Sequence, residues 1–155
     1  MEEEWLMTSS GEIKFMAGIT VTLDFDGYWR EVNKKFLPDQ SGIYCVYAST
    51  FNSEKKTVSV RKLIYIGESA DVCQRLATHN KLEDWKKHLT SGETLCYAVA
   101  KIPPASRVRV EAALINKLTP PENSEYTGEF PYNKTTVNSA GRCLYLPETV
   151  SVGGL

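Results

Sequence analysis

Four side chains of this sequence have the types and the order to do chemistry together. Tyr44 ends the tripeptide Gly-Ile-Tyr, Tyr65 opens the tripeptide Tyr-Ile-Gly, and Arg75 and Glu111 follow. A carboxylate can hold a divalent cation, a guanidinium can bind a phosphate, and a tyrosine hydroxyl can exchange a proton with water. Such a set could hydrolyse a phosphodiester with one metal ion, because the cation and the arginine would offset the charge of the phosphate.

Glu111 is the most telling of these residues. A helix is predicted from Ser106, as its cap, to about Leu118, and its apolar stripe comprises Val108, Leu114, Ile115 and Leu118. Glu111 lies on or beside this stripe and is expected to face inward. A buried carboxylate needs a cation, a hydrogen-bond network or a proton. The structural alternative is an ion pair with Arg75 or a place at the rim of the core.

The elements that must position these groups follow from the hydrophobic pattern. Apolar and polar residues alternate from Gly18 to Phe25, which predicts a half-buried strand. Asp26-Gly27 predicts a turn, and Pro38–Gly42 predicts a loop. A further strand is expected at Thr94–Ile102, and a last short one at Cys143–Leu146.

The two tyrosines fall in a predicted hairpin. Its strands are Ile43–Ala48 and Val58–Ile66, and the polar segment Ser49–Thr57 between them predicts a long, solvated tip. Tyr44 and Tyr65 can share one face of this pair, although a one-residue slip in register would separate them. Most tyrosines in strands are simply packed, so the hairpin alone does not indicate a site.

A helix is predicted to follow the hairpin, from Ser69 to His79, with Ser69 as its N-cap. Its apolar stripe comprises Val72, Cys73, Leu76 and Ala77. Arg75 and His79 are four residues apart and are therefore neighbours on the flank of this stripe. A second short helix is expected at Leu82–Leu89, and His88 is expected at the surface.

Composition limits the class of protein. A chain of 155 residues with 42% apolar residues fits one domain, and no apolar run is long enough to span a bilayer. The acidic start, Met1–Glu4, differs from a signal peptide, and the four scattered cysteines fit neither a zinc site nor a disulfide framework. A cytoplasmic protein is expected. The net charge of −1 argues against tight non-specific binding to DNA.

The ordered set of motifs resembles the GIY-YIG nucleases. The run Glu111-Ala112-Ala113-Leu114-Ile115, followed by Pro120 and Asn123, resembles the helix pattern E-x2-L-I-x4-P-x2-N of that family. The segment Tyr65–Ser69, with Arg75 and His79 behind it, resembles the second strand and first helix of the family. The resemblance covers about residues 41–125.

The resemblance implies a role for each of the four opening residues. Glu111 would hold a single divalent cation, Mg²⁺ or Mn²⁺. Tyr44 would accept a proton from the attacking water, and Tyr65 would hydrogen-bond the phosphate or that water. Arg75 would bind the scissile phosphate and stabilise the charge that builds on it.

The resemblance also assigns two supporting residues and leaves two departures. His79 would help in proton transfer or phosphate contact, and Asn123 would brace the site, with Asn133 as a weaker occupant of that role. Glu68 stands where repair-type relatives carry a lysine, so one phosphate contact of those relatives is missing. The Ser49–Thr57 segment lengthens the gap between the two tripeptides and would contact substrate or a partner.

The expected fold is α/β, a small mixed or antiparallel sheet flanked by helices. Residues 1–40 are predicted to form a β-rich extension that packs on the core. Residues 41–146 would form the GIY-YIG nuclease-like domain, and residues 147–155 a C-terminal tail.

Three functions remain open from the sequence. The leading hypothesis is a metal-dependent endonuclease that cleaves DNA in a structure-selective way, with targeting supplied by a protein partner or an oligomer. The alternative is a catalytically inactive module of the same fold that binds nucleic acid or a protein. A restriction or homing endonuclease is weaker, because the sequence shows no recognition element.

Overall fold

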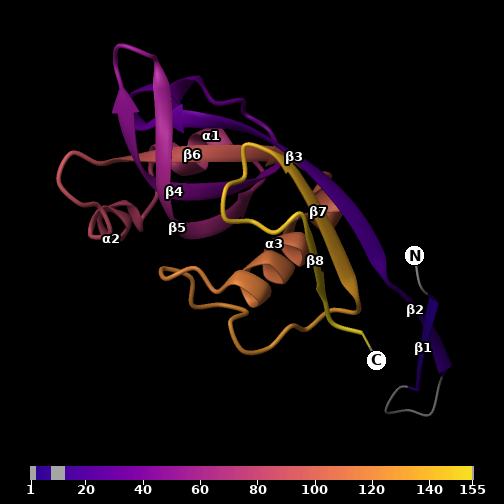
Figure 1. Ribbon diagram of the computed structural model, residues 1–155. Coiled ribbons are helices and arrows are strands. Elements are labelled where there is room, and N and C mark those ends of the chain that lie inside the picture. The colour runs from indigo at the N-terminus through magenta and orange to yellow at the C-terminus, as the bar shows by residue number, and fades with distance from the viewer. Residues whose placement is uncertain (1–2, 8–12, 155) are drawn as a thin grey trace.

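The computed structural model describes residues 3–7 and 13–154. Within them, six strands form one mixed sheet in the order β5-β4-β6-β3-β7-β8, with helices on both faces (Figure 1). The strands are β3 (Ile19–Arg30), β4 (Gly42–Asn52), β5 (Thr57–Ser69), β6 (Thr94–Lys101), β7 (Thr135–Gly141) and β8 (Thr149–Val152). The helices are η1 (Glu31–Phe36, a 3-10 helix), α1 (Val72–Ala77), α2 (Leu82–Lys86) and α3 (Pro104–Leu118). β1 (Glu3–Met7) and β2 (Ile13–Ala17) pair with each other. The predicted α/β class is confirmed.

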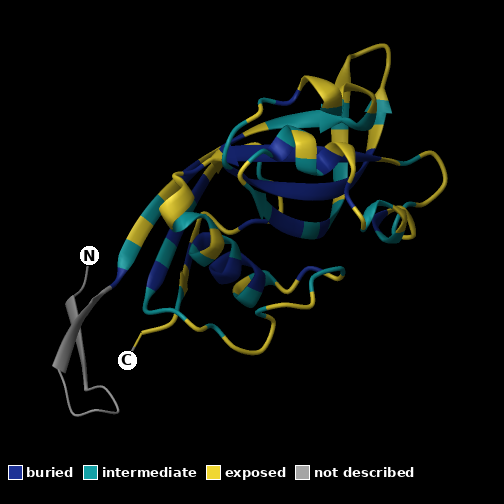
Figure 2. Cartoon of the chain, turned by 180° about the vertical axis from the view of Figure 1, so that it is seen from behind, coloured by how far each residue is buried: buried dark blue, intermediate teal, exposed yellow. Residues whose placement is uncertain are grey.

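The core lies on both faces of the central strands. β4 is buried from Gly42 to Ser49, so its apolar run reads as continuous rather than alternating (Figure 2). One face packs against α3, β7 and β8 and includes Ile43, Cys45 and Tyr47. The other face packs against α1, α2 and Leu37, the residue after η1, and includes Tyr44, Val46 and Ala48.

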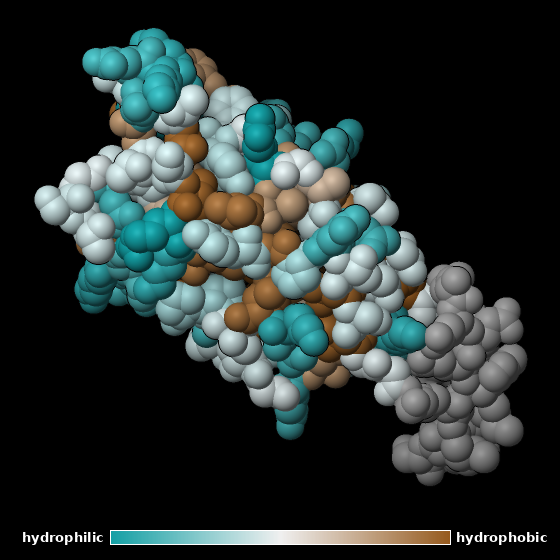
Figure 3. Space-filling model, viewed as in Figure 1, coloured by the Kyte–Doolittle hydropathy of each residue, from teal (hydrophilic) through white to brown (hydrophobic). Residues whose placement is uncertain are grey.

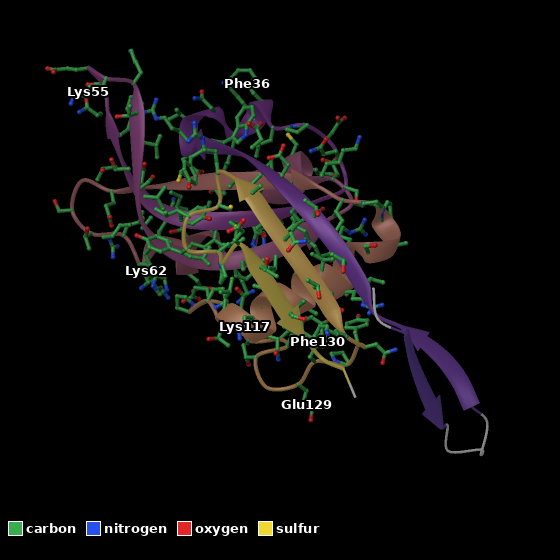
Figure 4. The ribbon with its side chains drawn as sticks, turned by 45° about the vertical axis from the view of Figure 1, so that its right-hand side comes forward. Phe36, Lys55, Lys62, Lys117, Glu129 and Phe130 are labelled. Carbon is green, nitrogen blue, oxygen red and sulfur yellow. The ribbon has the colours of Figure 1, made fainter. Side chains whose placement is uncertain are left out.

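The hairpin of β4 and β5 is longer than the sequence predicted. The two strands stay paired as far as Asn52 and Thr57, so most of the Ser49–Thr57 segment is strand rather than loop. Its exposed tip carries Lys55, and hydrophilic residues gather there (Figures 3 and 4).

β3 confirms the predicted alternation but not the predicted turn. Leu23 and Phe25 are buried and the intervening Asp24 is exposed. Instead of turning at Asp26-Gly27, the strand continues to Arg30, and its register against β6 shifts between Asp26 and Trp29. The one extra residue of β3 is absorbed as a bulge, which keeps both halves of the strand on the sheet.

Helices α1 and α3 begin or end at residues other than those predicted. Asp71, not Ser69, caps α1, because its carboxylate accepts from the Gln74 amide at 3.0 Å while Ser69 still belongs to β5. α1 ends at Ala77, before His79. α3 begins at Pro104, ahead of the predicted cap at Ser106.

The C-terminal strands lie on either side of the predicted Cys143–Leu146 strand, which is a turn instead. β7 runs parallel to β3, and β8 pairs antiparallel with β7. The division of the chain at residues 40 and 146 stays a prediction. β3 and β8, which lie outside those boundaries, hydrogen-bond into the same sheet as β4. In the described residues, no helix has the length and apolar character needed to cross a membrane.

Candidate active site

A cavity of about 240 Å³ opens beside β5, the edge strand of the sheet. Helix α1 and its following loop form one wall, and α3 with the loop after it forms the other. The residues that line it include Tyr44, Tyr65, Arg75, Glu111 and Asn123, five of the six site residues predicted from sequence. The sixth, His79, is buried behind Tyr44.

The strand register brings the two tyrosines together. Tyr44 pairs with Gly67 and Val46 pairs with Tyr65, so both phenol rings lie on the same face with centroids 6.3 Å apart. A side chain at position 67 would overlap the Tyr44 ring. The glycine of the second tripeptide is therefore needed because the first tyrosine lies across it.

His79 fixes the hydroxyl of Tyr44. The Nε2 atom of His79 lies 3.0 Å from the Tyr44 hydroxyl, and its Nδ1 atom accepts from the Lys81 amide at 3.0 Å. Burial, together with the positive charges of Arg75 and Lys81, lowers the pKa of His79 to about 4. The neutral ring must carry its proton on Nε2, since Nδ1 accepts, and so it donates to Tyr44.

The two tyrosines resist ionisation in this environment. Burial is the main cause that raises the pKa of both Tyr44 and Tyr65 above the ordinary value of 10.0. The positive charge of Arg75 acts in the opposite direction and lowers the pKa of both tyrosines. A tyrosinate here therefore depends on nearby cations and donors.

Glu111 faces the cavity from α3, as the helical stripe predicted. Burial, followed by the negative charges of Glu68 and Glu125, raises the pKa of Glu111 to about 8. Glu68 itself is held by Arg107. Without a cation, Glu111 is mainly protonated at neutral pH, and a cation would favour its charged form.

Glu111 is the residue that could hold a divalent cation. A carboxylate in a polar cavity suits Mg²⁺ or Mn²⁺, which keep several waters and take phosphate oxygens as ligands, and Glu68 and Glu125 line the same cavity. Among the described residues, no group of three or more His, Cys, Asp or Glu side chains converges into a metal cluster. A cation at Glu111 would therefore take water and substrate oxygens among its ligands.

Asn123 braces the edge of the sheet beside the cavity. Its side-chain oxygen accepts from the Ile66 amide and its side-chain nitrogen donates to the Ile66 carbonyl, both at 2.9 Å. The neighbouring Glu122 amide donates to the Ile64 carbonyl at 3.1 Å. The loop after α3 thus satisfies the edge of β5 as a further strand would. Asn133 lies elsewhere, before β7, where its carbonyl accepts from Arg109.

Two residues that contact the loop after α3 were missed or misplaced from sequence. His88, predicted at the surface, is half-buried, with Nε2 2.7 Å from the Glu122 carboxylate and Nδ1 2.9 Å from the Lys62 ammonium. Lys81 lines the cavity and was not predicted. Both lie in irregular segments next to short helices, where hydrophobic periodicity does not indicate which way a side chain points.

Sequence comparison agrees with this geometry. The model of the GIY-YIG catalytic domain matches residues 40–127, which is more than half of the chain. No curated protein and no solved structure matches the chain. The chain belongs to the GIY-YIG family. Membership implies a nuclease-type activity in general and a nucleic acid as the class of substrate.

Proposed function

We propose that this protein is a metal-dependent endonuclease that hydrolyses phosphodiester bonds in DNA at the cavity beside β5. The main observation in support is the placement of Tyr44. Its hydroxyl is held by neutral His79, it lies beside Arg75, and Glu111 lines the same cavity. The cavity thus brings together a proton acceptor (Tyr44), a guanidinium that can bind phosphate (Arg75) and a carboxylate that can bind a metal ion (Glu111).

Each residue has a role that its surroundings support. Arg75 binds the scissile phosphate, and its guanidinium stabilises the charge that builds on the oxygens. Tyr44 takes a proton from the attacking water once it is ionised. Arg75 and the N–H of His79 favour that ionised form, which burial opposes. Tyr65 hydrogen-bonds the phosphate or the water.

Glu111 would hold Mg²⁺ or Mn²⁺, which when bound supplies a Lewis acid and lowers the pKa of its water. Asn123 keeps β5, and with it Tyr65, in place against α3.

Structure-selective cleavage, with targeting by a partner or an oligomer, is part of the proposal. The net charge of −1 supports it, because a protein with no excess positive charge needs shape or a partner to hold DNA. The second candidate is an inactive module that binds nucleic acid or a protein. The same charge favours it, as does the pairing of Glu68 with Arg107 in place of a phosphate-binding lysine.

Cleavage of labelled DNA tests the proposal. Branched, nicked, duplex and single-stranded DNAs are incubated with purified protein and Mg²⁺ or Mn²⁺. We expect cleavage of at least one form, loss of cleavage in Glu111→Gln, and no loss in Glu129→Gln, which changes an exposed carboxylate outside the cavity (Figure 4). If all four DNAs stay intact with both metals, the endonuclease is refuted and the inactive module is favoured.

A further inference from the structure

We propose that Lys81 is a second phosphate-binding residue of the cavity, which holds the phosphate next to the scissile one and so positions the strand. The proposal rests on the proposed nuclease function. Lys81 lies in the loop between α1 and α2, and its side chain lines the same cavity as Arg75 and Glu111.

The two cations that line the cavity are held by neutral partners. The guanidinium of Arg75 donates to the amide oxygen of Asn80 at 3.0 Å, and the ammonium of Lys81 donates to the Glu122 carbonyl at 3.3 Å. Neither forms an ion pair with a carboxylate in the described part of the chain. Their positive charge is therefore available to an anion.

Other basic residues near carboxylates are already neutralised. Glu68 is bound by Arg107, and Glu93 is bound by Arg61. On α2, Lys86 pairs with Glu83 and the following Lys87 pairs with Asp84. Lys81 differs from these residues because it combines a place in the cavity with the lack of a negative partner. It could replace the phosphate contact that Glu68 cannot make.

Both cations lie close to the tyrosine pair. Arg75 acts on both tyrosines through its charge, and the Lys81 ammonium lies 5.9 Å from the centre of the Tyr65 ring. A strand whose scissile phosphate meets Arg75 would therefore carry a neighbouring phosphate towards Lys81. This position fits a role in holding the strand, with no direct action on the reacting atoms.

The backbone and the side chain of Lys81 act separately. Its amide fixes the ring of His79, and that contact survives any substitution that keeps the N–H. Lys81→Met therefore removes the charge, keeps most of the aliphatic stem and leaves the tautomer of His79 unchanged. Lys117→Met is the matched control, because Lys117 is an exposed lysine of α3 outside the cavity (Figure 4).

Binding is measured first, on the Glu111→Gln background, with a labelled DNA duplex over a range of salt concentrations. Lys81→Met should weaken binding roughly tenfold at low salt and reduce the salt slope by about 1. Lys81→Arg should restore both, and Lys117→Met should leave both unchanged. If Lys81→Met binds as Lys117→Met does, or if Lys81→Arg does not restore binding, the inference is overturned.

Steady-state cleavage then separates positioning from chemistry. Lys81→Met should raise KM with little change in kcat, whereas a fall in kcat at unchanged KM would overturn the positioning role. The proposed function fails separately, when the wild-type protein cuts no DNA. In that case the binding assay still decides whether Lys81 contacts phosphate.

Discussion

Replacing Glu111 with glutamine should stabilise the protein in the absence of metal and change how its stability depends on pH. The folded-state pKa of Glu111 is about 8, against an ordinary value of 4.5. Between these values the folded state binds more protons than the unfolded chain, so stability falls as pH rises. The slope is about 1.4 kcal/mol per pH unit, which amounts to about 2.7 kcal/mol between pH 5 and pH 7.

His79 acts in the opposite direction over part of this range. Its pKa falls from 6.5 to about 4 on folding, so the unfolded chain binds the extra proton and stability rises with pH between these values. In the wild-type protein the two slopes should nearly cancel from pH 5 to 6.5, and stability should then fall towards pH 8. In Glu111→Gln, stability should rise to about pH 6.5 and then level off.

Urea unfolding at intervals from pH 5 to pH 8.5, with a chelator present, measures both curves. Glu129→Gln should follow the wild-type curve, because that carboxylate is exposed. Adding Mg²⁺ should stabilise the wild-type protein but not Glu111→Gln, since only a ligand that prefers the folded state shifts the equilibrium. The reasoning is refuted if Glu111→Gln and the wild-type protein differ by a constant amount at every pH.

Three further substitutions test the geometry of the site. Gly67→Ala should displace the Tyr44 ring, lower the unfolding free energy by about 1–3 kcal/mol and abolish cleavage; unchanged stability in a urea titration would contradict the overlap. Tyr44→Phe should reduce the cleavage rate by about 10²–10⁴-fold. It should lower the unfolding free energy by only about 1 kcal/mol, because the hydrogen bond to His79 is lost. A much larger fall in the unfolding free energy would instead attribute the lost cleavage to a folding defect. Asn123→Ala leaves the amide and carbonyl of Ile66 without their partner and should cost about 1–3 kcal/mol, with faster hydrogen exchange at Ile66; exchange as slow as in the wild-type protein would count against the brace.

The parts of the site that periodicity controls were predictable from the sequence. Glu111 faces the cavity because a helical stripe has a fixed period. Tyr44 and Tyr65 share a face because strand residues alternate and the pairing keeps them two positions apart. Asn123 was found through a motif that spans the end of a helix, where the chain has no other regular feature.

The parts that depend on non-local contacts were not predictable. β7 reads Thr-Thr-Val-Asn-Ser-Ala-Gly, which is a weak strand signal, and its partner β3 lies more than a hundred residues earlier. Lys81 and His88 follow short helices, and their direction is set by contacts with the loop after α3. The sequence predicts a turn at the bulge in β3 because Asp-Gly is typical of turns. Only the pairing of the residues on both sides of it with β6 shows that the strand continues.

The loop after α3 both covers the edge of β5 and forms one wall of the cavity. Glu122 and Asn123 occupy the hydrogen-bonding groups with which another chain could otherwise add a strand. The same loop forms one wall of the cavity. A change that moves the loop away to admit a larger substrate would therefore also expose the unpaired backbone groups at the edge of β5. Substitutions that open this loop should therefore also favour association of the protein through the uncovered edge of β5.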